Sequence, residues 1–187
     1  MYNEEQTNNF GCPENRLALK CSMRLAWLQH VYWTRLLLIS IAERLKDESD
    51  TAARLLKNPA DIADIFACYF GEDDANQIAA LLTEHLKIGA DLITALRDEK
   101  TEEAEKLNQE WYINADKMAK AFSEINPYYS YDDLKKMLNT HLDLTTNEVK
   151  ARLAGKYKED IKAFAKVEKE ALMMADYFVS GIIWKFP

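Results

Sequence analysis

Three histidines are the residues of this sequence whose type and position could support chemistry. His30, His85 and His141 are the only histidines in the chain, and each lies in the middle of a segment with helical periodicity. A neutral imidazole can bind a metal or exchange a proton near pH 7. Because the three occupy equivalent positions on their segments, we expect them to meet in one buried polar site.

The residues around the three histidines are of the same kinds. A bulky apolar residue stands three positions before and three positions after each of them, and the residue four positions after is small: Thr34, Gly89 and Thr145. Positions three and four apart share one face of a helix. Each imidazole is therefore expected to lie among apolar side chains, with room beside the ring for an ion, a water molecule or a small ligand.

The last helical segment adds a carboxylate to this set. Its apolar stripe contains Ile161, Ala165, Leu172, Ala175, Val179 and Ile182. Glu168 is the one polar member of that stripe, and a buried carboxylate must be paired, protonated or bound to a cation. We therefore predict that Glu168 joins the three histidines. Asp176, at the edge of the same stripe, and Glu148, seven residues after the last histidine, are alternatives for this carboxylate.

Three imidazoles and one carboxylate are the ligand set of a mononuclear metal site. Imidazole binds zinc, iron, copper and nickel, and a carboxylate adds a hard anionic ligand. The set fits zinc or iron best and manganese less well. It is too small for the usual di-iron arrangement, which uses about four carboxylates and a Glu-x-x-His spacing. The prediction includes an open coordination position for a small ligand, and it leaves open whether the site is catalytic or structural.

Two other readings of the same residues stay open. A buried histidine is more often a hydrogen-bonded core residue than a ligand. The protein could thus be a structural or interaction bundle in which the histidines form a buried polar network with Glu168 and Thr34 or Thr145. It could also bind a small organic ligand beside Thr34, Gly89 and Thr145.

The composition indicates an all-α protein. Gly and Pro number 5 and 4 in 187 residues, and Ala, Leu, Lys and Glu, which favour helix, dominate the long stretches between them. The apolar periodicity predicts helices over 14–46, 51–70, 74–98, 101–124, 131–152 and 157–184. We predict an antiparallel four-helix bundle with two additional shorter helices, 51–70 and 101–124. Residues 1–14 are expected to form a flexible N-terminal arm, and 15–187 a single domain.

Charge and cysteine usage narrow the partners and the compartment. The net charge of −7 argues against a nucleic acid or an anionic membrane as partner. The longest apolar run, 36–39, is far too short to span a membrane, and residues 1–9 do not look like a signal peptide, so we expect a cytoplasmic protein. Cys12, Cys21 and Cys68 form no CxxC motif and are expected to be reduced thiols, with a disulfide or a metal role at Cys12 and Cys21 as the less favoured option.

A weak internal repeat is present. A shift of 56 residues superimposes His85 on His141, Asn58 on Asn114 and Phe66 on Phe122. We interpret the repeat as two similar units, each a shorter helix followed by a bundle helix. Separately, the sequence from Thr145 to Glu148 is typical of a capping box and predicts a break in the helix 131–152. Asn114 and Asp116, near Trp111, are candidates to support the site or to act as local caps.

Several blocks of the chain resemble an uncharacterised bacterial family that occurs in Bacillus- and Clostridium-type organisms. The blocks are HVYWTR at 30–35, RLLKN at 54–58, WYINAD at 111–116, HLDLT at 141–145, ALMMAD at 171–176 and the final FP. They occur in the same order and cover nearly the whole chain after the arm. The resemblance implies a helical bundle and carries no activity with it. A looser similarity to ferritin-like bundle metalloproteins is one of architecture only.

Overall fold

The computed structural model describes residues 12–187, and every regular element in that range is a helix. The helices are α1 (Arg16–Ala42), α2 (Glu48–Leu55), α3 (Asn58–Phe70), α4 (Glu72–Arg97), α5 (Thr101–Ile125), α6 (Tyr131–Leu153) and α7 (Tyr157–Lys185). The all-α prediction is confirmed. No helix in this range has the length and the low charge of a bilayer-spanning segment. Most of the predicted N-terminal arm, 1–14, lies outside the described residues.

Local signals in the sequence set the helix ends. At the start of α1, Asn15 accepts a hydrogen bond from the backbone N–H of Ala18 at 3.0 Å, and Ser130 caps α6 in the same way. A side-chain acceptor here satisfies one of the donors that a helix start leaves free. Gly71, with a φ of +89°, lets the chain turn sharply from α3 into α4. These signals fix where α1, α4 and α6, the three helices that carry the histidines, begin.

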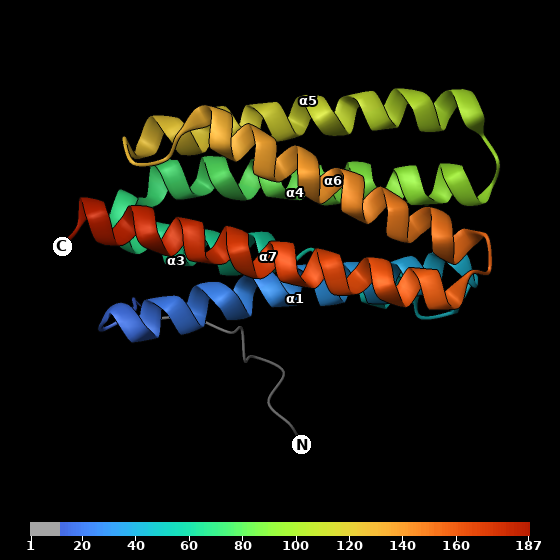
Figure 1. The fold of residues 1–187 in the computed structure, drawn as a ribbon, viewed down its shortest axis with the longest axis horizontal. Coiled ribbons are helices and arrows are strands. Elements are labelled where there is room, and N and C mark those ends of the chain that lie inside the picture. The colour runs from blue at the N-terminus through green and yellow to red at the C-terminus, as the bar shows by residue number, and fades with distance from the viewer. Residues whose placement is uncertain (1–11) are drawn as a thin grey trace, which may run out of the picture.

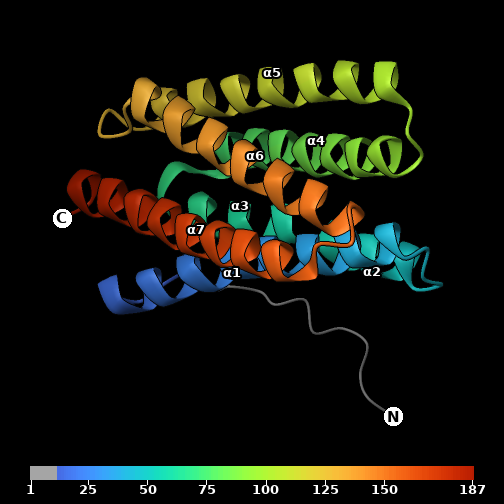
Figure 2. The same cartoon turned by 45° about the vertical axis from the view of Figure 1, so that its right-hand side comes forward.

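The helices form three antiparallel hairpins. α1 packs on α3, α4 on α5 and α6 on α7, and the two members of each pair run in opposite directions (Figures 1 and 2). α3 also packs on α4, α5 on α6, and α7 on α1, so the three hairpins close into a ring. The short helix α2 precedes α3 and packs on α1. The first helix of each hairpin, α1, α4 or α6, carries one histidine.

This ring differs in three ways from the predicted set of four long and two shorter helices. α5 has 25 residues against 26 in α4, and it packs on both α4 and α6 as a full member of the ring. The segment 51–70 is two helices, because Pro59 in the first turn of α3 has no N–H to continue α2. α6 runs without a break through Thr145, because Glu148 pairs with Arg35 instead of capping a new helix.

The 56-residue repeat extends to a third unit. Its members occur in α3, α5 and α7: Asn58, Asn114 and Glu170; Ala63, Ala119 and Ala175; Phe66, Phe122 and Phe178. Each unit is a helix that carries a histidine, followed by the antiparallel helix of the same hairpin, which we call the return helix. The prediction of two units, each beginning with the shorter helix, is therefore wrong: there are three units, and each begins with the histidine helix. The physical basis of the repeat is the closure of three similar hairpins around one axis.

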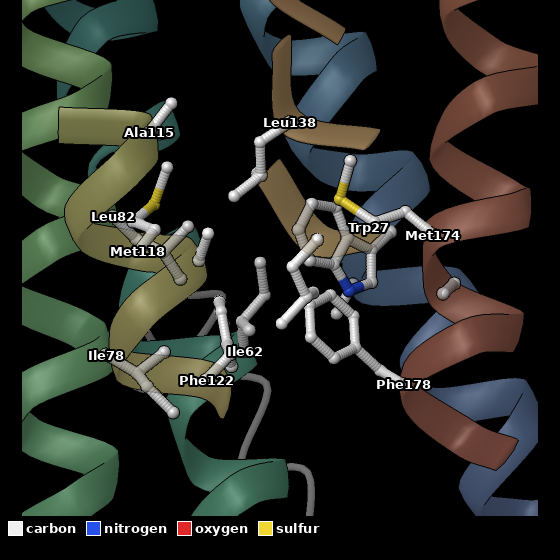
Figure 3. Packing of buried hydrophobic residues seen from close by; sticks show 14 of the residues in the cluster. Trp27, Ile62, Ile78, Leu82, Ala115, Met118, Phe122, Leu138, Met174 and Phe178 are labelled. Carbon is white, nitrogen blue, oxygen red and sulfur yellow. The ribbon is translucent and has the colours of Figure 1, made fainter. Parts of the chain in front are cut away.

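The three phenylalanines of the repeat meet in the main core. Their ring centroids lie 5.2 Å (Phe66–Phe122), 5.4 Å (Phe66–Phe178) and 4.5 Å (Phe122–Phe178) apart. Trp27 stacks on Phe178 with centroids 5.4 Å apart, and Figure 3 shows Ile62 beside this group. Buried aromatic rings contribute a large apolar area and a defined contact geometry. This cluster anchors all three return helices beside the histidines.

A disulfide joins Cys12 to Cys68, so the prediction of reduced thiols is wrong for this pair. The bond ties the residue stretch before α1 to the end of α3. Cys21, which the sequence analysis considered as a possible partner of Cys12, is an exposed free cysteine. Because spacing alone does not determine disulfide pairing, the bond between Cys12 and Cys68 could only be recognised once the fold brought the two residues together.

Candidate metal centre

His30 on α1, His85 on α4 and His141 on α6 converge, as predicted. Their exposed fractions are 3%, 3% and 5%, and one potential ligand atom from each lies within 4.8 Å of the other two. The ring centroids are 6.1 Å apart for His30 and His85, 5.8 Å for His30 and His141, and 6.3 Å for His85 and His141. Each of the three hairpins thus contributes one imidazole to a single buried group.

Asn58, the first residue of α3, fixes the His30 ring and its tautomer. Its Nδ2 donates to the backbone oxygen of Ala26 at 2.9 Å, and its Oδ1 faces Nδ1 of His30 at 3.1 Å. An amide oxygen can only accept a hydrogen bond. Nδ1 of His30 therefore carries the ring proton, and the lone pair of the neutral imidazole is on Nε2.

Asn114 on α5 holds His85 with the same geometry. Its Nδ2 donates to the backbone oxygen of Leu81 at 3.1 Å and to Glu84 at 2.9 Å, and its Oδ1 accepts from Nδ1 of His85 at 3.2 Å. In both units the backbone oxygen belongs to the residue four before the histidine. Trp111 stacks on the His85 ring with centroids 5.2 Å apart. The supporting role expected of Asn114 is confirmed.

Glu170 on α7 is the third partner, and the sequence prediction missed it. Its carboxylate accepts from Nδ1 of His141 at 2.9 Å, and its side chain is nearly buried. A carboxylate has no proton to offer when ionised, so Nδ1 of His141 is the donor. The repeat could have identified Glu170, because this residue lies 56 residues after Asn114, just as Asn114 lies 56 residues after Asn58.

The protonation state of the site suits a metal ligand. Burial, together with repulsion from His141, lowers the pKa of His30 to about 3. Burial and then the two neighbouring histidines also lower the pKa of His85 well below its ordinary value. Because a metal binds the neutral form of imidazole, neither of these rings has to lose a proton at pH 7 before it binds.

Each of the three rings has its Nδ1 engaged by a partner, so Nε2 is the ring nitrogen that remains to bind an ion. Within residues 12–187, the side-chain hydrogen bonds of the three imidazoles are those at Nδ1. A polar network among the rings needs at least one N–H directed from one ring to the next, and with the acceptors at Nδ1 this requires a second proton on one of the rings. Zinc–imidazole bonds of about 2.0–2.1 Å place tetrahedral ligand nitrogens roughly 3.3 Å apart. A small inward movement of the rings thus suffices to bind an ion.

Glu168 lies outside the histidine group. It accepts a hydrogen bond from the hydroxyl of Tyr32 at 2.6 Å on the surface between α1 and α7. Two residues along a helix correspond to a rotation of about 200°, so Glu168 and Glu170 point in nearly opposite directions. The buried face of α7 passes through Val167 and Ala171, and the predicted stripe was therefore out of phase in the first half of the helix.

The two alternative carboxylates are also engaged elsewhere. Asp176 pairs with Arg24 on the surface. Glu148 is buried and pairs with Arg35, which also donates to Asp160 at 2.7 Å. Burial raises the pKa of Glu148 to about 7, although the Arg35 guanidinium acts to lower it. Asp116, the other candidate support residue, accepts from Tyr131.

A narrow cavity of about 20 Å³ adjoins the histidines. Thr34, Gly89 and Thr145, the small residues four positions after each histidine, all line it. The expected room beside the rings is thus present. A volume of this size is sufficient for one water molecule, so a metal held by the three rings would have a coordination position open toward this space.

The donor set defines what the site can do. Three histidines with a fourth, open position form a ligand set that zinc uses when it binds and activates water, and imidazoles also suit iron, copper and nickel.

Comparisons of the chain with models of known protein families, with curated proteins and with solved structures give no match.

Proposed function

We propose that this protein binds one divalent transition-metal ion through Nε2 of His30, His85 and His141. The observation that supports the proposal is the hydrogen bond at each Nδ1, which engages that nitrogen with an acceptor and leaves Nε2 of each ring to bind an ion. Metal-bound histidines commonly donate their other ring N–H in this way.

Zinc or iron is the ion that we propose, with a fourth coordination position open to the cavity. The proposed ligand set is the three histidines, with Glu170 acting through His141 and no carboxylate bound directly. One histidine comes from each hairpin, so the ion joins all three. Because metal binding favours the folded chain, the bound ion is expected to stabilise the ring.

Metal analysis of protein expressed without a histidine tag tests the proposal. We expect about one equivalent of metal per chain in the wild type and its loss in His85→Ala. Glu168→Gln is the matched control, because it changes a carboxylate that lies outside the site, and it should keep the metal. A wild-type chain that takes up neither zinc nor iron on reconstitution, or a His85→Ala variant that still binds one equivalent, contradicts the proposal.

Thermal melting separates the metal site from a purely structural polar network. A metal-binding protein melts at a lower temperature after treatment with a chelator and recovers when the ion is returned. A structural network predicts a melting temperature that a chelator does not change. The two readings thus give opposite results in one measurement on the wild-type chain.

A further inference from the structure

The cavity beside the histidines adjoins a wider groove at the surface. The groove has a volume of about 280 Å³ and lies between α1, α2 and α4. Four apolar residues line both spaces: Leu37, Leu55, Leu86 and Ala90. These four side chains, which we call the neck, separate the groove from the imidazoles.

The neck lies where the return segment of the first hairpin is interrupted. Leu55 is the last residue of α2, and α3 begins at Asn58. In the other two hairpins the return helix, α5 or α7, continues through the corresponding region. Because of the break between α2 and α3, the end of a short helix lies between the groove and the histidines, where a continuous return helix would otherwise pass.

Thr145 lines the cavity and carries a hydroxyl without a partner. Its Oγ1 is buried and makes no hydrogen bond to any residue in the described range. Thr34, the equivalent residue in the first unit, donates to the backbone oxygen of His30 at 2.8 Å, which is the common arrangement for a threonine in a helix. Because an unpaired buried hydroxyl is unfavourable, Thr145 is a group that a bound ligand can satisfy.

We infer that the neck beside α2 admits an uncharged ligand of one to three non-hydrogen atoms to the fourth coordination position, where the Thr145 hydroxyl forms a hydrogen bond with it. This inference rests on the proposed metal site. The size limit follows from the cavity of about 20 Å³. The absence of charge follows from the apolar neck, because an ion loses its hydration there without compensation. Water, dioxygen and nitric oxide belong to this class.

Nitric oxide binding to the iron(II)-loaded protein tests the size limit. We expect the high-spin iron–nitrosyl signal in electron paramagnetic resonance, in proportion to bound iron. Imidazole, which is uncharged but has five ring atoms, should neither change the spectrum nor compete with nitric oxide. Binding of imidazole as readily as nitric oxide overturns the size limit.

Two neighbouring threonines provide a matched pair of variants. Thr145→Val removes the hydroxyl in the cavity, and Thr146→Val removes one that is also unpaired but faces the pocket beside Tyr112 and Lys150. We expect nitric oxide to dissociate about tenfold faster from Thr145→Val and at the wild-type rate from Thr146→Val. Equal rates in the two variants overturn the role of Thr145.

Leu55→Trp tests the route of entry. The larger side chain at the end of α2 should slow nitric oxide binding by about tenfold or more without changing the iron content. An unchanged binding rate overturns the assignment of the neck. If the wild type takes up neither iron nor zinc, the proposed function itself has failed. If it takes up zinc but no iron, the present inference, which is tested on the iron-loaded protein, has failed. If iron binds at one equivalent and nitric oxide gives no nitrosyl signal, only the present inference has failed.

Discussion

Glu170 accepts a hydrogen bond from Nδ1 of His141 at 2.9 Å, in the position where the other two units have an asparagine. The charged acceptor makes this hydrogen bond stronger than the two that end on an amide oxygen. His141 and Glu170 belong to the same hairpin, α6 and α7. A change at Glu170 should therefore act on the metal through His141.

Replacement of Glu170 should weaken metal binding without removing a ligand. We expect Glu170→Leu to reduce metal affinity by about 10–100-fold, and Glu170→Gln, which keeps an oxygen acceptor, to reduce it less. Glu168→Leu, two residues earlier on the same helix, is the control and should bind as the wild type does. Competition with a chromophoric chelator measures all three. Equal losses at the two positions contradict the assigned role of Glu170.

The stability of the metal-free protein should depend on pH through the buried histidines. The pKa of His30 is about 3 in the folded chain and about 6.5 in an unfolded one, so the unfolded chain takes up the proton first. Stability is therefore complete above about pH 6.5 and decreases as the pH falls toward 3. The decrease is up to about 1.4 kcal/mol per pH unit for each such histidine. Denaturant unfolding at several pH values measures this slope.

Comparison with His30→Gln isolates that effect from other titrating groups. Glu148, whose pKa is raised to about 7, acts in the opposite direction, because its folded form binds a proton more readily than its unfolded form. Its contribution is common to both proteins and cancels in the difference. The variant should show a slope smaller by up to one proton between pH 6.5 and 4. Identical slopes argue against a neutral, buried His30.

Arg35 should contribute strongly to stability through two buried carboxylates. The side chains of Arg35, Glu148 and Asp160 are 15%, 4% and 1% exposed. We expect Arg35→Met to lower the free energy of unfolding by about 3–5 kcal/mol, because it leaves the buried Glu148 without its cationic partner, whereas Asp160 keeps Arg152. Arg24→Met is the control, since the Arg24–Asp176 pair is 40% and 38% exposed and should contribute at most about 1 kcal/mol. Urea denaturation compares them, and similar losses contradict the prediction.

Phe122 should be important for stability but not for metal stoichiometry. It is 1% exposed and contacts both other phenylalanines of the repeat. Phe122→Ala should lower the free energy of unfolding by about 3–5 kcal/mol and still bind one equivalent of metal. Ile113→Ala on the same helix changes a residue that is 56% exposed and should change stability by about 0.5 kcal/mol or less. A loss of metal in folded Phe122→Ala protein argues against this separation.

The bond between Cys12 and Cys68 should stabilise the folded chain. It closes a loop across a sequence separation of 56 residues, and the entropy lost by the unfolded chain corresponds to as much as about 4 kcal/mol. We expect Cys68→Ser, or reduction of the wild type, to lower the melting temperature. Cys21→Ser, which removes the free exposed thiol, should not change it. A wild-type protein that melts at the same temperature with and without reductant contradicts this prediction.

The sequence by itself determined the helical class and the three histidines as one buried group. The helical class follows from composition and from the periodicity of apolar residues, which are local properties of the chain. The histidines could be recognised because each lies on the inward face of its own helix, with a small residue one turn later, and no histidine remains elsewhere. Asn114 could be proposed as a supporting residue from its place near Trp111, with the role of a local cap as the alternative.

Only the tertiary structure decided which groups contact the imidazoles and how the helices close. Glu168 and Glu170 are two residues apart on one helix, and the rotation of α7 against α1 and α6 selects which of them faces His141. That rotation depends on the packing of residues distant in sequence, including Phe66 and Phe178. The pairing of Cys12 with Cys68 has the same origin, because distances between remote residues are set by packing and not by any local pattern.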